Sequence, residues 1–204
     1  MSQNTSSAVM QQRVEPHDSL DFFPTPLWAT RALCELLGGK KALSKLTAWE
    51  PACGEGHMAR PLAEYFSQVV ASDVHPYGFG LVRDFLSSTP EYVNADWIIT
   101  NPPFRLADAF IKTAKQHANI GIAVLVRTAF LEGVSRYEEL FSQFPPNIIA
   151  QFCERVPMLK GRLVENASTA TAYCWVIWNR SLAGTTFEWI SKCRVRLERP
   201  GDYA

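Results

Sequence analysis

The chain has 204 residues and a formal net charge of zero, and 47% of its residues are hydrophobic against 20% charged. This balance is typical of a folded globular domain; it excludes wholesale disorder and a strongly basic coat protein for nucleic acid. No apolar run approaches the ~20 residues of a membrane helix, and the first residues lack a signal-peptide pattern. The five cysteines are scattered without a CxxC pair, so we expect reduced thiols in a cytoplasmic protein.

Turn residues and apolar periodicity divide the chain into an N-terminal arm and one domain. Residues 1–20 are polar and aperiodic and predict a flexible arm, and residues 21–204 predict a single domain. Thr25 is expected to cap the first helix, with Pro26 at its first position and a glycine pair at its end. The remaining expected elements are strands at 46–50, 68–74, 96–100, 120–126, 148–153 and 170–178, and helices at 57–66, 107–117 and 136–144.

The order of these elements predicts an α/β fold. Strands that alternate with helices indicate a Rossmann-like, doubly wound and mostly parallel sheet. The two late strands have no helix between them, so we expect an antiparallel C-terminal hairpin at the edge of the sheet. Residues 154–170 form an irregular excursion between these strands and are a candidate substrate-recognition element.

Unusual residues follow the expected strands of the first half of the chain. Glu50 ends a strand, Gly54 and Gly56 form the next turn, and Asp73 lies at the end of the following strand. In an open α/β sheet the ligand crevice lies at the carboxyl ends of the strands, so these residues are expected to meet there. Glycines without Cβ atoms allow a ligand close to the backbone, although a tight structural turn explains them equally simply.

The acidic residues favour a cationic ligand over a pyrophosphate. Gly54-x-Gly56-x-x-Ala59 matches a loose dinucleotide fingerprint, with Asp73 placed to bind ribose hydroxyls. Glu50 beside the turn disfavours pyrophosphate but favours an ammonium group. Asp84 offers another polar partner, or is simply a solvated loop residue. S-adenosylmethionine, with one ribose, one adenine and a cationic end, suits this set.

The tetrapeptide Asn101-Pro102-Pro103-Phe104 follows an apolar strand. Two prolines stiffen the backbone and remove two hydrogen-bond donors. The Asn101 side-chain oxygen and the Pro102 carbonyl can then accept from one NH₂ group, and Phe104 supplies a flat face for a planar substrate. A strand-ending loop with a core phenylalanine is the alternative interpretation.

Taken together, these motifs resemble the class I S-adenosylmethionine-dependent methyltransferases, most of all the N6-adenine-specific DNA methyltransferases. The resemblance covers residues 22–178. Its motifs are Phe22-Phe23-Pro24-Thr25-Pro26, Glu50-Pro51-Ala52-Cys53-Gly54-Glu55-Gly56, Asp73, Asp84-Phe85, Asn101-Pro102-Pro103-Phe104 and the stretch AVLVRTAFLE at 123–132.

The resemblance implies an N-methyltransferase that acts on the N6 amine of adenine in DNA, with roles for named residues. Catalysis falls to Asn101, Pro102, Pro103 and Phe104, and the target base leaves its stack to lie against Phe104. The residues implied in acceptor binding are Phe104, Lys160 and Arg162. Those implied in binding S-adenosylmethionine are Thr25, Pro26, Glu50, Ala52, Cys53, Gly54, Gly56, Asp73, Asp84, Phe85 and Asn101. No metal is implied, and the histidines lack ligand spacing.

Other functions fit parts of the same pattern. An RNA adenine methyltransferase would share nearly all of it, and a glutamine side-chain amide is also a planar conjugated NH₂ acceptor. A nucleic-acid-binding subunit with a vestigial cofactor fold and a nicotinamide oxidoreductase are further alternatives, disfavoured by the intact motifs and by Glu50. Only 154–170 and the tail remain for target recognition, so a partner subunit or a homodimer is expected to share that task. Residues 151–204 carry eight basic and five acidic side chains, which could form a phosphate-binding face.

Overall fold

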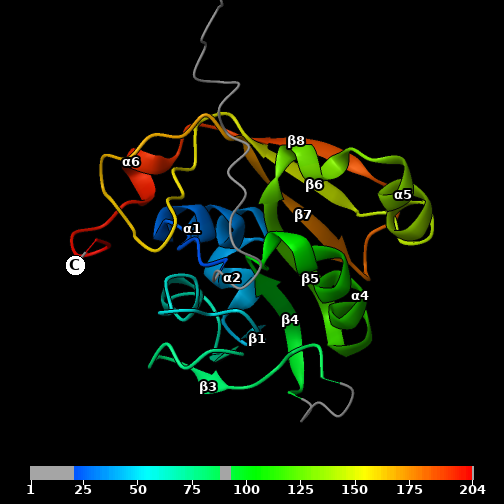
Figure 1. Ribbon diagram of the computed structural model, residues 1–204, viewed down its shortest axis with the longest axis horizontal. Helices are drawn as coiled ribbons and strands as arrows, with labels where there is room; N and C mark the ends of the chain where they lie inside the picture. Colours follow the sequence, from blue (N-terminus) through cyan, green and yellow to red (C-terminus); the bar gives the residue numbers. More distant parts are fainter. Residues whose placement is uncertain (1–20, 88–92, 204) are drawn as a thin grey trace, which may run out of the picture.

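The computed structural model describes residues 21–87 and 93–203, so the expected arm at 1–20 lies outside the described residues. An eight-stranded sheet runs through the centre of the molecule (Figure 1). Its strands, in spatial order, are β3 (Leu81–Val82), β2 (Gln68–Asp73), β1 (Thr47–Glu50), β4 (Ala95–Thr100), β5 (Ala118–Arg127), β7 (Tyr173–Asn179), β6 (Ile148–Phe152) and β8 (Thr186–Ile190).

The mixed sheet confirms the predicted fold class. Strands β3, β2, β1, β4 and β5 pair in parallel, while β7 is antiparallel to both of its neighbours, β5 and β6. The antiparallel pair of late strands is therefore confirmed, but its position at the edge is wrong because the unexpected strand β8 pairs in parallel with β6 and forms that edge. β8 has the sequence Thr-Phe-Glu-Trp-Ile, but only Ile190 is buried, and Phe187 and Trp189 stay largely exposed on this edge strand.

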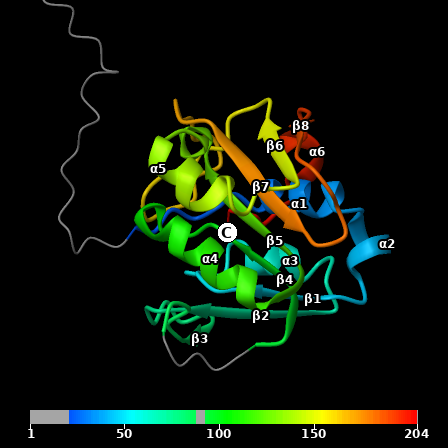
Figure 2. The same cartoon turned by 90° about the vertical axis from the view of Figure 1, so that its right-hand side faces the viewer.

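Helices cover both faces of the sheet, as Figure 2 shows. One face carries α1 (Leu27–Leu36), α2 (Gly39–Leu43), α3 (Ala59–Leu62) and α6 (Arg194–Leu197). The other carries α4 (Ala107–His117), α5 (Val134–Arg136) and the π-helical turn Tyr137–Phe141. Each face has its own core cluster; Trp28 and Trp175 belong to the first and Trp178 and Ile98 to the second. Strands buried on both sides read as continuous apolar runs, as β5 does.

Two expected helices begin or end elsewhere. Thr25 does not cap α1: Pro26 is the N-cap residue, there is no side-chain cap, and the Thr25 hydroxyl contacts Asn101 instead. The helix expected over 57–66 shrinks to α3, because Pro61 has no N–H to donate to the preceding turn. The short 3₁₀ helices Phe104–Leu106 and Thr128–Leu131 follow β4 and β5.

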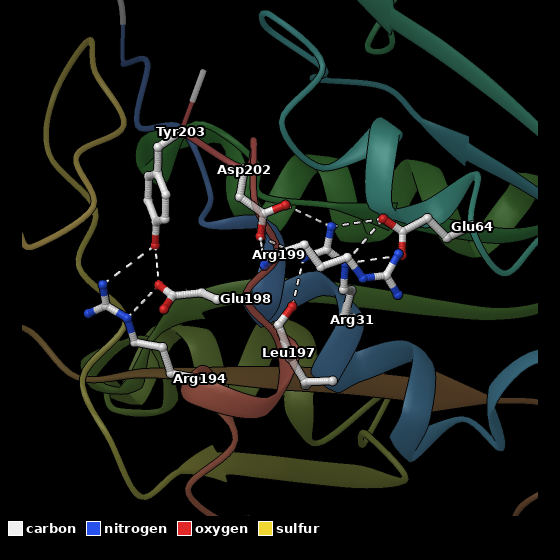
Figure 3. A network of polar contacts seen from close by, with 8 residues as sticks. All are labelled: Arg31, Glu64, Arg194, Leu197, Glu198, Arg199, Asp202 and Tyr203. Carbon is white, nitrogen blue, oxygen red and sulfur yellow. Dashed lines mark hydrogen bonds and ion pairs between the residues drawn. The ribbon is translucent and has the colours of Figure 1, made fainter.

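A buried arginine fastens the C-terminal segment to the first helices (Figure 3). The Arg31 guanidinium, on α1, donates to both carboxylate oxygens of Asp202 at 2.7 and 2.8 Å, to Glu64 at 2.8 Å and to the Leu197 carbonyl at 2.7 Å. Burial alone lowers the pKa of Arg31, but the hydrogen bonds to Asp202 and Glu64 outweigh burial and raise it. The tail from α6 onward is thus held by charge-assisted bonds as well as by packing.

Within residues 21–87 and 93–203, none of the helices has the length and apolar character needed to cross a bilayer.

Candidate active site

The motif residues meet at one edge of the sheet because β2, β1 and β4 are parallel neighbours. Glu50 ends β1, Asp73 ends β2 and Asn101 directly follows β4. Parallel strands place their carboxyl ends on the same side of a sheet, so these three residues from distant parts of the chain lie together where open α/β sheets bind their ligands; the loops around them are called the crevice below.

The turn after β1 is fixed to the end of β2 by backbone hydrogen bonds. The Cys53 N–H donates to the Ser72 carbonyl at 2.9 Å, and the Gly54 N–H donates to Asp73 Oδ2 at 2.9 Å. The His75 N–H donates to Asp73 Oδ1 at 3.0 Å. The Asp73 carboxylate is therefore oriented by the backbone on both oxygens and keeps lone pairs for further donors, such as ribose hydroxyls.

Gly54 and Gly56 are required here by their conformation and by their neighbours. Both have positive φ, +49° and +84°, which L side chains rarely adopt. A Cβ on Gly54 would lie 2.4 Å from the Phe22 ring, and a Cβ on Gly56 would lie 2.5 Å from the Phe79 ring. The rings of Phe22 and Phe79 therefore occupy the space that side chains at Gly54 and Gly56 would need.

Glu50 is buried at this turn with an incomplete set of hydrogen bonds. Its side chain is 2% exposed, it accepts a bond from the backbone of Ala59, and its Oε2 atom has no partner. Burial raises its pKa well above the usual value, the nearby Asp73 charge raises it further, and the Ala59 bond opposes both. A buried carboxylate is stable only beside a cation or a donor. The orphaned oxygen therefore fits an ammonium-bearing ligand.

The Asn101 side chain is held in one orientation. Its Nδ2 donates to the Phe23 carbonyl at 2.9 Å and to Thr25 Oγ1 at 3.1 Å, and contacts the sulfur of Met158 at 3.6 Å. A backbone carbonyl can only accept, so the Phe23 contact fixes which end of the amide is nitrogen. Oδ1 is then left buried without a partner. An acceptor of this kind is what an NH₂ group would need.

Phe104 contacts two other segments of the chain, residues 21–25 and the end of β5. The Phe23 ring approaches it at 5.1 Å between centroids, and the Arg127 guanidinium lies 3.9 Å from its centroid. The Phe104 N–H donates to Asp21 Oδ2 at 2.6 Å. Residues 21–25 therefore contact the glycine turn, Asn101 and Phe104 together, which links the two halves of the crevice.

The excursion at 154–170 contacts the 21–25 segment. It contains no regular helix or strand, only an isolated bridge between Leu159 and Arg162. The Gly161 N–H at the tip of this turn donates to the Phe22 carbonyl at 2.9 Å, so Lys160 and Arg162 are exposed beside the 21–25 segment. Met158 is buried against Asn101 and Thr25, a contact that no feature of the sequence indicates.

The remaining predicted cofactor residues differ in their surroundings. Asp84 is exposed just after β3, where its Oδ1 accepts from the Leu86 N–H at 2.9 Å. Phe85 is 2% exposed and packs edge-on against Trp49, so core packing already accounts for it and its contact with an adenine ring stays a prediction. Burial raises the pKa of Cys53 to about 12, so that thiol stays protonated at neutral pH.

Arg127 is the residue at this edge that motif reasoning missed. It ends β5 and lies over Phe104, although the sequence analysis named the stretch 123–132 without assigning the arginine a role. The rule used for Glu50 and Asp73, that polar residues at strand ends face the crevice, would have found it.

Four of the six buried side-chain nitrogen or oxygen atoms without a partner, counted over the described residues, gather at this edge. They belong to Glu50, His57, Thr100 and Asn101. Native proteins satisfy most buried polar groups, so a cluster of exceptions marks a place where a ligand completes the bonding.

Comparison with known proteins relies on structure alone, because no protein-family model and none of the curated proteins matches the chain. A protein from Listeria monocytogenes assigned as a class I S-adenosylmethionine-dependent methyltransferase superposes with a TM-score of 0.61 at 11% identity, over 85% of this chain and 67% of that one. The chain has the class I methyltransferase fold.

Two further structures with this fold carry names that refer to a restriction enzyme and to ribosomal RNA. A protein from Vibrio vulnificus assigned as the modification subunit of a type I restriction enzyme gives a TM-score of 0.56 at 17% identity, over 89% of this chain and 51% of that one. The 16S rRNA N2 G1207 methyltransferase of T. thermophilus, in complex with AdoMet and guanosine, gives 0.52 at 18% identity, over 80% and 44%. This chain therefore spans about half the length of those two proteins.

Proposed function

We propose that this protein is an S-adenosylmethionine-dependent N-methyltransferase acting on the N6 amine of adenine in DNA. The observation that carries the proposal is the fixed amide of Asn101: its nitrogen is engaged by Phe23 and Thr25, and its buried oxygen is left without a donor beside Phe104. This arrangement suits an exocyclic NH₂ group on a flat ring.

The residues around the glycine turn suit the methyl donor. The orphaned oxygen of Glu50 would hold the ammonium group, the Asp73 carboxylate would accept from ribose hydroxyls, and Asp84 would accept from the adenine amine. Thr25, Pro26, Ala52, Cys53, Gly54 and Gly56 would line the same site. Bound there, S-adenosylmethionine would supply an electrophilic methyl group.

The acceptor half of the site would make the amine reactive. The lone pair of an adenine N6 amine is delocalised into its ring, which makes it a poor nucleophile. Asn101 Oδ1 and the Pro102 carbonyl would accept its two hydrogens, Pro103 would keep the loop rigid, and Phe104 would support the ring. Catalysis would then come from positioning and from preorganised acceptors, without a protein nucleophile.

DNA is the acceptor that the combined evidence favours. The motif set resembles DNA adenine methyltransferases, and one protein of the same fold is assigned as a restriction-modification subunit. Lys160 and Arg162 lie exposed beside the 21–25 segment, where they could contact phosphates. We propose that a partner subunit or a second copy of this chain shares in target recognition.

A methyl-transfer assay tests the proposal. The protein is incubated with tritiated S-adenosylmethionine and, separately, duplex DNA lacking adenine methylation, single-stranded DNA, total RNA and a protein extract, and the labelled nucleosides or amino acids are identified. We expect N6-methyldeoxyadenosine. Label in RNA adenine or in glutamine would identify that group as the acceptor in place of DNA. Absence of transfer to all four substrates would refute the proposed methyltransferase activity.

A further inference from the structure

Arg127 lies beside the crevice residues, but the proposed reaction gives it no role. It is the last residue of β5, at the edge where Asn101 follows β4, and its guanidinium carbon lies 3.9 Å from the centroid of the Phe104 ring. That distance is a stacking distance, so a flat cation already lies on the ring expected to hold a flat substrate.

The backbone of Arg127 is fixed while its guanidinium is not buried. Arg127 pairs with Tyr173 across β5 and β7, and their side chains share a hydrogen bond. Burial raises the pKa of the Tyr173 hydroxyl, and that hydrogen bond together with the arginine charge partly offsets the rise. The Arg127 residue as a whole is exposed. A long side chain at the end of a rigid strand can move its guanidinium while the strand stays in place, at the loss of its hydrogen bond with Tyr173.

The other contacts of Phe104 limit where a flat acceptor can lie on its ring. Phe23 packs on the ring at a tilt of 46°, and the Phe23 carbonyl also holds Asn101, so moving Phe23 would disturb the amine-binding residue. A planar group that lies on the face of Phe104 covered by Arg127 would therefore share the place of the guanidinium. Guanidinium planes stack on nucleobases in the same way as on aromatic side chains.

We propose that Arg127 is an acceptor-binding residue that covers Phe104 in the free protein and stacks on the outer face of the target nucleobase in the complex. This inference rests on the proposed function and narrows it, because a ring held on both faces is a nucleobase rather than a side-chain amide. The stacking needs the plane of the guanidinium, not its charge alone.

Steady-state methylation of unmethylated plasmid DNA tests the role. Arg127→Ala should raise the KM for DNA about tenfold to a hundredfold, the range expected for loss of one stacking contact, with kcat within a few-fold of wild type. Calorimetry should give an unchanged affinity for S-adenosylmethionine, and the thermal midpoint should confirm folding. Arg180→Ala is the matched control. Arg180 is an exposed arginine whose backbone N–H donates to the Ile120 carbonyl, so it lies near the start of β5, at the opposite end of that strand from Arg127.

Arg127→Lys separates stacking from simple attraction to phosphate. If the guanidinium plane matters, lysine should fail to restore the KM, and the salt dependence of DNA binding should keep its slope in both variants. If Arg127 instead binds a phosphate, lysine should restore the KM, and the slope should fall by about one in the alanine variant alone. That result, or a wild-type KM for Arg127→Ala, overturns the inference.

The two proposals fail in different ways. Methyl transfer to DNA by the wild type together with an unchanged KM in Arg127→Ala removes only the stacking role. Transfer to RNA moves the same comparison onto RNA, and transfer to glutamine or to no acceptor refutes the nucleobase contact along with the proposed function.

Discussion

Two sets of buried polar groups in this protein differ in how their hydrogen bonds are satisfied. Around Arg31, each charged partner is engaged: Asp202 uses both carboxylate oxygens, Glu64 uses both of its own, and the Leu197 carbonyl accepts as well (Figure 3). At the crevice, Glu50 Oε2 and Asn101 Oδ1 are equally buried but have no partner.

The difference predicts a structural role for the Arg31 set and a ligand-binding role for the crevice set. The Arg31 cluster joins α1, α3 and the C-terminal tail, and its bonds are complete without any ligand. The crevice groups leave bonding capacity that the protein itself does not use, and an unpaired buried polar atom is unfavourable by about 1–3 kcal/mol. We therefore expect mutations in the first set to change stability and mutations in the second to change ligand binding or turnover.

Arg31→Met should give the largest effect, a loss of about 3–5 kcal/mol in the free energy of unfolding, because Asp202 would remain buried without its counter-charge. Urea denaturation followed by circular dichroism measures it. The control is Arg196→Met, which breaks the exposed pair with Glu35 and should barely move the midpoint. Equal midpoints for both variants would show that burial adds nothing to the Arg31 cluster.

Asn101→Ala should lower kcat by about 10²–10³-fold, since a preorganised hydrogen-bond partner of the reacting group is lost. Affinity for S-adenosylmethionine should stay within a few-fold by calorimetry, and stability should change little. Asn119→Ala should keep wild-type turnover, because this exposed asparagine lies at the start of β5, at the opposite end of the strands from Asn101. Full activity in Asn101→Ala would remove the acceptor role.

Asp73→Ala should weaken binding of S-adenosylmethionine by about 1–3 kcal/mol, the value of one hydrogen-bond acceptor with charge. Part of this loss would come through the Gly54 N–H, which Asp73 also accepts. Isothermal titration calorimetry gives the affinity, with Asp108→Ala as a control at a carboxylate paired to Arg136. An unchanged affinity would move the ribose contact elsewhere.

Glu50→Gln should give the smallest change in stability, a gain of about 1 kcal/mol near neutral pH, or about 2–4 °C in the thermal midpoint. The folded pKa of Glu50 is raised, so the wild type loses stability as pH rises from the unfolded value of about 4.3 through the folded one. The glutamine variant should lack that contribution. Thermal melts of the ligand-free protein at a series of pH values compare the two.

The same titration gives an opposite expectation for the ligand. An ammonium group favours the ionised carboxylate, so S-adenosylmethionine should bind the wild type more tightly as pH rises and should release protons on binding. Calorimetry in two buffers of different ionisation enthalpy detects this release. Glu50→Gln should bind weakly with no such release, and identical proton release in both proteins would place the ammonium group away from Glu50.

Several helices and strands of this protein could be predicted from the local sequence. The strands ending in Glu50 and Asp73 and the helix Ala107–His117 were expected within a residue or two, because strong apolar patterns and clear turn residues bound them. β8 was missed although its sequence, Thr-Phe-Glu-Trp-Ile, contains residues that favour strands, and α6 was missed because it has only four residues. A helix this short is stabilised by its neighbours and not by its own pattern.

Spacing along the chain was enough to predict the class of fold and to single out Glu50, Asp73 and Asn101 as candidate site residues. Which buried atoms stay unpaired depends on tertiary contacts, because residues 21–25, Met158 and Arg127 pack onto the 101–104 loop. Those contacts join residues up to 78 positions apart in the chain. No local pattern encodes them, since they arise from strand order and from the packing of loops above the sheet.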